Sequence, residues 1–393
     1  MTSPAVEANL YEELMASATR IGRIAEAEAL EADKNATVSE NVINAIREEQ
    51  IHRLLLPKDY GFPQIDFWTY ADLIKKVSYH NLSAAWLTCF YSLHNAWVSY
   101  LPKDFRDEVV ASGGFTADVF APVGKLEECE GGYLISGQWN FVSGILHSEW
   151  VALGALLQFE GKDVKEGAAA CVRVADLTII ENWDALGVRG SGSHSVIADK
   201  VFVKKEAVLR MSNMQEQSRP PEAALGQPYD KDYLYYDMPW YPGFYIGFAS
   251  MAVGGAERVV EEFRKSTEKR VRVSGVNEHE SPTSQRVLAE ISMELKAAQA
   301  LLNEYIAQMY RDRDQPYNEA EYKAMRASLI RKCVDIAVRS LLTLGGHAVL
   351  KGHPVELFTR DLLTIGTHLS SLYEDAVNVY GKKLFGFPVV ARG

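Results

Sequence analysis

The chain has 393 residues, of which 47% are hydrophobic and 24% charged, a composition typical of a folded protein with two or three domains. Its 52 acidic and 41 basic residues give a net charge of −11 with no basic run, which argues against a nucleic-acid partner. The sequence shows no apolar run of membrane-span length, no leader-like N-terminus and only four scattered cysteines, so we expect a cytoplasmic protein without membrane association or a metal site.

Residues 1–113 predict an N-terminal helical domain. Apolar residues recur at helical spacing over 8–31 and 35–50, with polar residues on the opposite face. After a loop rich in proline and glycine, a helix follows that turns Tyr70 and its neighbours inward. The next segment, 86–101, is apolar nearly all round, so we expect it to be deeply buried.

Residues 114–210 predict a central β-domain. From Gly131 the sequence GGYLISGQWNFVSG alternates apolar and polar residues and is punctuated by glycine, as half-buried antiparallel strands are. We expect an antiparallel, barrel-like sheet, with strands near 116–120, 132–143, 149–158, 169–180 and 195–203.

Helical periodicity returns at residue 244 and predicts a C-terminal four-helix bundle over 244–393. Its four long amphipathic segments are 246–269, 284–311, 318–345 and 354–380. Between the β-domain and the bundle lies a loop, 211–243, with five tyrosines and one tryptophan between 229 and 241. We expect this loop to cover a pocket. The predicted fold class is therefore mainly α with a central β-domain.

Three segments in this order resemble the acyl-CoA dehydrogenase superfamily, and the resemblance covers nearly the whole chain. GGYLISGQWNFVSG is similar to the strand that runs along the flavin ring in that family. GVRGSGSHSVIADKVFV is similar to the turn and strand that close the β-domain, and RDLLTIGTHLSSL to the segment that delivers a side chain to the flavin. The resemblance also implies a homotetramer in which a neighbouring subunit touches the cofactor.

One departure from the family pattern selects a branch. Many dehydrogenases of this family carry a glutamate shortly after an Arg-Asp pair, where it removes the α-proton of an acyl thioester. Here no carboxylate follows Arg360 and Asp361 until Glu374, and His368 stands in that segment. Thioester deprotonation needs a positioned strong base, although some family members place their glutamate on another helix. A histidine at this place resembles the flavin-dependent monooxygenases of the same fold, such as dibenzothiophene monooxygenase and the oxygenase component of p-hydroxyphenylacetate hydroxylase.

That branch implies the oxygenase component of a two-component system. Reduced FMN, or FAD, would come from a separate NAD(P)H:flavin reductase and react with O₂ to a C4a-hydroperoxide that oxygenates a small aromatic or heteroaromatic substrate. The chain shows no G-x-G-x-x-G nicotinamide fingerprint after a strand, in agreement with a separate reductase. Two alternatives stay open: an acyl-CoA dehydrogenase or oxidase with its base elsewhere, and a flavin-free binding member of the fold.

Three residues are the predicted catalytic groups. His368 would hold or pass a proton, since the ordinary pKa of imidazole lies near neutrality, or it is a capping histidine. The match of WNFVSG to the branch's strand would put Ser143 beside the flavin N5, unless it is an ordinary strand residue. His94, on an otherwise apolar helix, is either a pocket residue or a buried structural one.

The predicted cofactor-binding residues fall into three groups, each implied by the resemblance. The strand residues Trp139, Asn140, Phe141, Val142 and Ser143 would pack along the flavin edge. Arg189, Gly190 and Ser191 offer donors and small side chains for phosphate or ribityl, as a backbone nest would, though an ordinary turn has the same composition. Arg270 (or Arg272), Gly345 and Gly346 would contact the phosphate end. The family's usual glutamine before the glycine pair is Leu344 here, which makes FMN credible.

Overall fold

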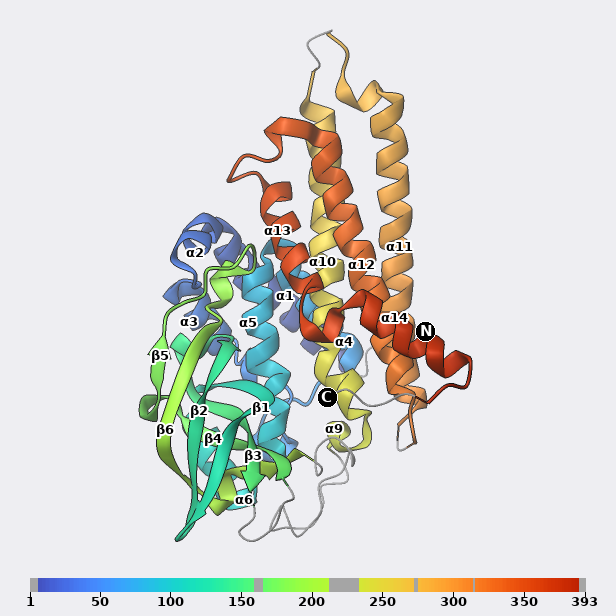
Figure 1. Ribbon diagram of the computed structural model, residues 1–393. Helices are drawn as coiled ribbons and strands as arrows, with labels where there is room; N and C mark the ends of the chain where they lie inside the picture. Colours follow the sequence, from blue (N-terminus) through green and yellow to red (C-terminus); the bar gives the residue numbers. More distant parts are fainter. Residues whose placement is uncertain (1–5, 159–164, 212–232, 272–274, 314, 389–393) are drawn as a thin grey trace.

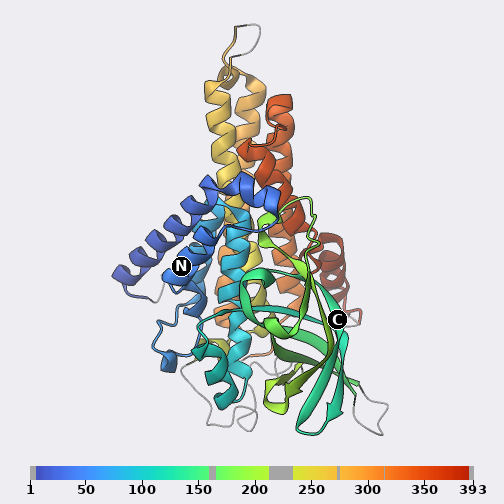
Figure 2. The same ribbon diagram turned by 90° about the vertical axis from the view of Figure 1, so that its left-hand side faces the viewer.

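The computed structural model describes residues 6–158, 165–211, 233–271, 275–313 and 315–388. Helices occupy both ends of the chain and a seven-stranded sheet lies between them, beside the lower half of a long helical bundle (Figures 1 and 2). The fold class predicted from the sequence is confirmed. The N-terminal helices are α1 (Ala8–Ala27), α2 (Ala29–Asn35), α3 (Glu40–Glu48), α4 (Phe67–His80), α5 (Leu82–Ser92) and α6 (Lys103–Ala111).

The sheet has the strand order β5-β6-β2-β1-β3-β4-β7, and its neighbours are antiparallel except for the parallel pair β1 and β3. Its strands are β1 (Phe115–Cys129), β2 (Gly132–Val142), β3 (Ser148–Gln158), β4 (Lys165–Arg173), β5 (Thr178–Ile180), β6 (His194–Lys204) and β7 (Val208–Arg210). The single strand that we expected over 169–180 is two strands at opposite sides of the sheet. A 3₁₀ turn at Val174–Asp176 separates them, because the chain must cross the sheet between its pairing with β3 and its pairing with β6.

The C-terminal helices are α9 (Leu234–Asp237), α10 (Trp240–Lys269), α11 (Pro282–Arg311), α12 (Glu319–Leu344), α13 (Pro354–Gly366) and α14 (Tyr373–Leu384). Helix α10 is the hub, since it packs against α4, α5, α11, α12 and α13. Its glycines allow this close packing: a Cβ on Gly247 would lie 2.1 Å from Cys89 Sγ of α5, and one on Gly254 would lie 2.3 Å from the Lys75 carbonyl of α4. The small residues of α10 therefore seat the bundle on the N-terminal helices.

Two predicted helices end earlier than the apolar pattern indicated. The helix expected over 86–101 stops at Ser92 and continues as a 3₁₀ helix, His94–Tyr100. The helix expected over 354–380 breaks into α13 and α14 around a short 3₁₀ turn at Leu369–Ser371. A buried cation stabilises the second break: Arg326 of α12 donates through Nη2 to the carbonyl of Ser370, in the middle of the 3₁₀ turn, at 2.6 Å.

Most of the loop expected over 211–243 lies outside the described residues, and a role as a lid stays a prediction for that part. The described part packs into the core. Tyr233 donates to the Leu55 carbonyl at 2.6 Å, and Tyr236 donates to the Ser99 carbonyl at 2.7 Å. No helix in the described part of the chain is long and apolar enough to cross a membrane.

Candidate active site

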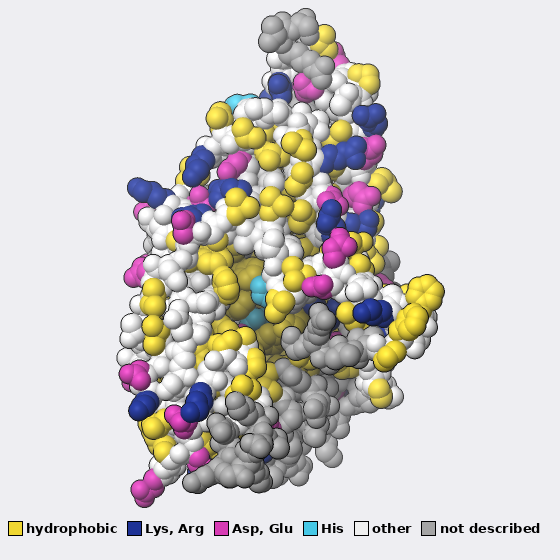
Figure 3. Space-filling model, viewed as in Figure 1, with side chains coloured by type: hydrophobic (Ala, Val, Ile, Leu, Met, Phe, Trp, Pro, Cys, Tyr) yellow, Lys and Arg dark blue, Asp and Glu magenta, His cyan; other side chains and the backbone are white. Residues whose placement is uncertain are grey.

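A hollow opens between the sheet and the C-terminal helices, with hydrophobic walls and histidine side chains at its floor (Figure 3). Aromatic rings of α5 and α10 form a connected cluster. Trp86 stacks on Phe90 with ring centroids 5.2 Å apart and meets the edge of Phe248 at 4.9 Å. Phe244 continues the cluster along α10, and all four rings are buried. Such walls exclude water and strengthen any polar contact made inside.

Ser143 stands directly after β2 and belongs to this cluster. It is 2% exposed, and its Oγ accepts a hydrogen bond from Trp86 Nε1 at 2.8 Å. The turn behind it requires glycine: Gly144 has φ +70°, and a Cβ there would lie 2.3 Å from the Tyr91 hydroxyl oxygen. Ser143 is thereby fixed against the tryptophan of the aromatic cluster.

A chain of hydroxyl groups leads from Ser143 into the β-domain. Ser143 Oγ is 2.9 Å from Ser193 Oγ, which is 2.8 Å from Ser191 Oγ. Ser191 in turn donates to the Val188 carbonyl at 2.7 Å. Because Ser191 spends its only proton on Val188, Ser193 must donate to Ser191, and Ser143 must donate to Ser193. Ser143 also accepts from Trp86 Nε1, which can only donate, and a hydroxyl oxygen accepts two hydrogen bonds. One acceptor position of Ser143 is therefore still available.

His368 lies in the break after α13 and contacts the same aromatic cluster from the bundle side. Its ring centroid is 4.6 Å from that of Phe248 and 5.7 Å from that of Trp86. Nδ1 accepts from the Ser370 backbone N–H at 3.3 Å, so the neutral ring carries its proton on Nε2. Loss of hydration, with the charge of Arg326 nearby, lowers the pKa of His368 to about 3. We expected a pKa near neutrality, but this environment keeps the imidazole uncharged at neutral pH.

His94 contacts the same aromatic cluster. Its ring stacks on Phe244 and tilts against Phe90, each at a centroid distance of 4.0 Å. Nδ1 contacts the Asp118 carboxylate of β1 at 3.1 Å, and both side chains are buried. His94 Nε2 is buried without a hydrogen-bond partner among the described residues. The structure thus brings the three predicted catalytic residues to one aromatic cluster.

The remaining strand residues have separate environments. Trp139 is fully buried inside the β-domain, where its Nε1 donates to the Gly154 carbonyl at 2.7 Å. Val142 is buried and pairs with β6. Asn140 accepts from the Ser195 hydroxyl at 2.8 Å. Phe141 sits at an irregular position of the ladder with φ +65°, and its side chain is 69% exposed. Asn140 and Phe141 are the partly exposed members of this set.

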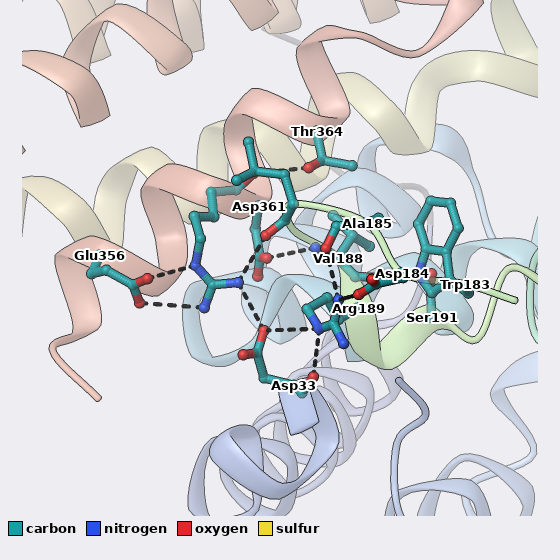
Figure 4. A network of polar contacts seen from close by, with 12 residues as sticks. Asp33, Trp183, Asp184, Ala185, Val188, Arg189, Ser191, Glu356, Asp361 and Thr364 are labelled. Atoms are coloured by element: carbon teal, nitrogen blue, oxygen red, sulfur yellow. Dashed lines mark hydrogen bonds and ion pairs between the residues drawn. The ribbon is translucent and has the colours of Figure 1, made fainter. Parts of the chain in front are cut away.

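Arg189 belongs to a clamp between domains (Figure 4). Its guanidinium donates to the Asp33 carbonyl of α2 at 2.6 Å and to Asp184 at 2.6 Å. Arg360 of α13 donates to Asp33 Oδ1 at 2.9 Å, and Asp361 accepts from the Val188 N–H at 2.6 Å. Arg360 also donates to Glu356 at 2.6 Å. We define the interdomain clamp as these residues, namely Asp33, Asp184, Val188, Arg189, Glu356, Arg360 and Asp361. It fixes the loop that carries the hydroxyl chain against both helical regions.

Gly190 sits within the same loop, packed against the N-terminal helices. Its carbonyl accepts from the Val38 N–H at 2.9 Å, and a Cβ on it would lie 2.9 Å from Ser83 Cβ. Gly190 therefore allows the loop to approach α5 closely.

Arg270, Gly345 and Gly346 form a separate group at the upper end of the bundle in Figure 1, where α10 and α12 end. Arg270 donates to the Leu344 carbonyl at 2.6 Å, so these residues lie side by side. A Cβ on either glycine would meet open space, and Leu344 is 4% exposed. Within one chain the structure does not bring this group to the hollow.

Sequence reasoning missed four residues of the site: Asp118, Ser193, Arg326 and Ser370. Asp118 is a buried acid in the mostly apolar first half of β1, and Arg326 is a buried base in a bundle helix, each 5% exposed or less. A charge on the apolar face of an element is a signal that could have found these two. Ser193 and Ser370 lie in polar turns and carry no such signal.

The aromatic cluster and the polar atoms beside it have the chemistry that a flavin site requires. The flavin ring is an apolar plane with polar edges, and the aromatic cluster offers flat apolar walls. At their edges stand Ser143 with one spare acceptor position, and two imidazole nitrogens.

Comparisons with known proteins point in the same direction. The family model described as "Acyl-CoA dehydrogenase, C-terminal domain" matches residues 246–371. The p-hydroxyphenylacetate 3-hydroxylase oxygenase component of Acinetobacter baumannii is 25% identical over 90% of this chain and 85% of its own length. The flavin-dependent monooxygenase oxygenase subunit HsaA of Rhodococcus jostii is 26% identical over 92% of this chain and 95% of its own. The solved structure of XiaF from Streptomyces sp., in complex with FADH₂ and glycerol, superposes with a TM-score of 0.88 at 22% identity, covering 98% of both chains. That superposition shows a shared fold.

Proposed function

We propose that this chain, which belongs to the acyl-CoA dehydrogenase superfamily and to its flavin-dependent monooxygenase branch, is the oxygenase component of a two-component system. It takes reduced FMN or FAD from a separate NAD(P)H:flavin reductase and uses O₂ to oxygenate a small aromatic or heteroaromatic substrate. When bound, the reduced flavin supplies the electrons that activate O₂. The protein supplies a dry cavity and a few oriented polar atoms.

The observation that carries this proposal is the identity of the groups around the aromatic cluster. An imidazole, His368, approaches from the bundle side where many dehydrogenases have a glutamate. The carboxylate nearest His94 is Asp118, which is bonded to His94. A thioester α-proton would need a free carboxylate base, whereas oxygen activation needs hydrogen-bond donors and a site that excludes water.

Each predicted catalytic residue then offers one atom for hydrogen bonding to the flavin, to oxygen or to the substrate. Ser143 Oγ has a spare acceptor position, which would meet an N–H at the edge of reduced flavin. His368, uncharged at neutral pH, presents Nε2–H as a donor to developing negative charge on oxygen. His94 presents to substrate an Nε2 that has no partner among the described residues. Asn140 and Phe141 border the same strand and are the predicted flavin-edge contacts.

An anaerobic titration separates this function from the acyl-CoA dehydrogenase alternative. We expect the purified protein to bind photoreduced FMN or FAD, and to leave oxidised flavin unbleached when octanoyl-CoA is added. On admission of O₂ with a reductase, we expect one atom of ¹⁸O₂ in an aromatic product. Bleaching of flavin by the thioester would favour the dehydrogenase, and failure to bind either redox form would favour a flavin-free protein.

The proposal extends to a homotetramer in which the third group of predicted cofactor residues serves a neighbouring subunit. Arg270, Gly345 and Gly346 lie at the upper end of the bundle. Three large apolar side chains near them are exposed, with exposed fractions of 75% for Leu342, 55% for Val349 and 59% for Leu350. Apolar area of this kind favours association. Analytical ultracentrifugation should find a tetramer, and Leu342→Glu should shift it towards smaller species.

Two further expectations belong to the same proposal. FMN should bind at least as well as FAD, because buried Leu344 replaces the glutamine expected for adenine binding. A cytoplasmic location agrees with free cysteines, of which Cys89, Cys171 and Cys333 are buried and Cys129 is half-buried. Competition dialysis between the two reduced flavins and cell fractionation test these expectations.

A further inference from the structure

Arg326 is a buried cation whose partners are not acids. It lies on α12 and is 1% exposed, and within the described part of the chain its guanidinium forms no ion pair. Its side chain lies over the ring of Tyr245, with Cζ 4.7 Å from the ring centroid. Because burying a charge without a counter-ion costs free energy, a cation at this place calls for a specific explanation.

The guanidinium holds the turn that follows α13. Its Nε and Nη2 donate to the Ser370 carbonyl at 3.2 Å and 2.6 Å. Its Nη1 lies 3.4 Å from the hydroxyl of Tyr305, which itself donates to the Pro242 carbonyl at 2.9 Å. Two N–H groups that converge on one oxygen fix its position more firmly than one, and arginine offers them in a planar fork that lysine lacks. Arg326 thus fixes the Ser370 backbone relative to α12.

Ser370 connects Arg326 to His368. The Ser370 N–H donates to His368 Nδ1 at 3.3 Å, and Ser370 Oγ lies 2.8 Å from the same nitrogen. An Nδ1 that accepts leaves the proton of the neutral ring on Nε2. One residue is therefore held by Arg326 at its carbonyl and by His368 at its N–H.

The charge of Arg326 also acts on the imidazole. Among the described residues, the charged or titratable groups that act on His368 are Arg326 of α12 and His94. Helices α5 and α10 contribute the uncharged rings of Trp86 and Phe248. Loss of hydration is the largest cause that lowers the pKa of His368 to about 3, and Arg326 is the second. The ring is therefore neutral at neutral pH, and its function depends on which nitrogen carries the proton.

We propose that Arg326 is a positioning residue for His368, which fixes the imidazole proton on Nε2 by holding Ser370 in place. This inference rests on the proposed function, in which Nε2–H of His368 is the donor to oxygen. Arg326 acts through Ser370 and needs no contact with flavin, oxygen or substrate.

The tautomer of His368 can be measured in the full-length protein without flavin. Magic-angle-spinning NMR of the chain labelled with [¹⁵N]histidine distinguishes protonated from unprotonated ring nitrogens, and the spectrum of His368→Ala identifies the signals of this residue. In the wild type at neutral pH we expect a protonated Nε2 and an unprotonated Nδ1. Arg326→Met removes the charge and the donors at similar side-chain length, and both tautomers should then be populated.

The rate of hydrogen peroxide release is the second measurement, and it needs no substrate. Without substrate, reduced FMN and O₂ give oxidised FMN and hydrogen peroxide. We expect this release to be about tenfold faster in Arg326→Met, because the donor of His368 is no longer held in place. The dissociation constant of reduced FMN should change less than about twofold. Arg326→Lys keeps the charge and one donor, so its rate should lie between those of Arg326→Met and the wild type.

Two variants are matched controls. Tyr305→Phe removes the other hydrogen-bond partner of the guanidinium and leaves the bonds to Ser370 in place. Arg331→Met removes an exposed arginine of the same helix, which pairs with Asp335. Both controls should keep the wild-type tautomer and the wild-type rate of peroxide release.

Each outcome decides a statement. A single Nε2–H tautomer in Arg326→Met, or an equal change in Tyr305→Phe, would overturn the positioning role. A mixed tautomer with an unchanged rate of peroxide release would overturn its importance for the reaction. If Arg326→Met does not fold, Arg326→Lys decides: the wild-type tautomer and rate there overturn the role, and a mixed tautomer supports it. Failure to bind reduced FMN contradicts the proposed function instead, and the NMR comparison then still decides whether Arg326 orients His368.

Discussion

Two groups of polar side chains join the β-domain to the helices, and they differ in how many of their hydrogen-bonding atoms are paired within the protein. In the interdomain clamp, Arg360 bonds Glu356, Asp33 and the Leu186 carbonyl, and Arg189 bonds Asp33, Asp184 and the Ala185 carbonyl (Figure 4). Around the hollow, Ser143 and the two histidines each bond the protein on one side and keep an atom available on the other. The comparison shows two different roles: paired charges stabilise the fold, whereas buried polar atoms with unused hydrogen-bonding positions indicate a ligand site.

Breaking the clamp should have the largest effect on stability. Arg360→Ala leaves the largely buried carboxylate of Glu356 without its cation, and leaves that of Asp33 with only Arg189 at 4.0 Å, so we expect a loss of about 3 kcal/mol in the free energy of unfolding. Urea denaturation followed by fluorescence measures it. The control is Arg331→Ala, which breaks an exposed pair with Asp335 and should cost only a few tenths of a kcal/mol. Equal losses in the two variants would show that the clamp is not a structural unit.

Removing the donor from the hollow should affect the reaction more than the fold. His368→Ala deletes Nε2–H, and we expect product formation per reduced flavin to fall on the order of 100-fold, with a matching rise in released hydrogen peroxide. Product yield by chromatography and a peroxide assay measure the two quantities. His279→Ala removes an exposed histidine of the bundle loop and should behave as the wild type. Normal coupling in His368→Ala would remove this residue from the mechanism.

Ser143 combines a structural role with a cofactor role, so we expect its loss to lower both the free energy of unfolding and the affinity for reduced flavin. Ser143→Ala leaves buried Trp86 Nε1 without its acceptor and should lower the free energy of unfolding by about 1–3 kcal/mol. It should also weaken binding of reduced FMN by about two- to tenfold. In the double variant with Trp86→Phe, part of the stability should return, since both partners of the bond are then gone. An unchanged affinity for reduced FMN would argue against Ser143 as a cofactor contact.

The stability contributions of His368, beside the aromatic cluster, and of Asp361, in the clamp, should depend on pH with opposite signs. Burial lowers the pKa of His368 to about 3, below its unfolded value of 6.5. Its contribution to the free energy of unfolding is therefore present above pH 6.5 and is lost as pH falls from there towards 3. Burial raises the pKa of Asp361 to about 7 from 3.8, so its contribution is present below about pH 4 and is lost as pH rises towards 7. Urea unfolding between pH 4 and 7.5 of His368→Gln and Asp361→Asn, each compared with the wild type, measures the two slopes. Slopes of the same sign would contradict these pKa shifts.

Local patterns in the sequence were sufficient for much of the fold. The three-part layout followed from where the apolar period changes from 3.6 to 2 and back, and the bundle helices α10, α11 and α12 lie close to the predicted ranges. The parallel pairing of β1 with β3 and the split of the expected strand 169–180 were not predictable, since long-range strand pairing decides them.

The sequence by itself determined which chemical groups this protein has: a serine after the β2 strand, an imidazole at position 368 and no carboxylate nearby until Glu374. Only the tertiary structure decided what those groups can do. The carboxylate that orients His94 lies 24 positions away, and the indole that bonds Ser143 lies 57 positions away. Which nitrogen of an imidazole carries the proton depends on such through-space contacts, and a single sequence encodes them only through the completed fold.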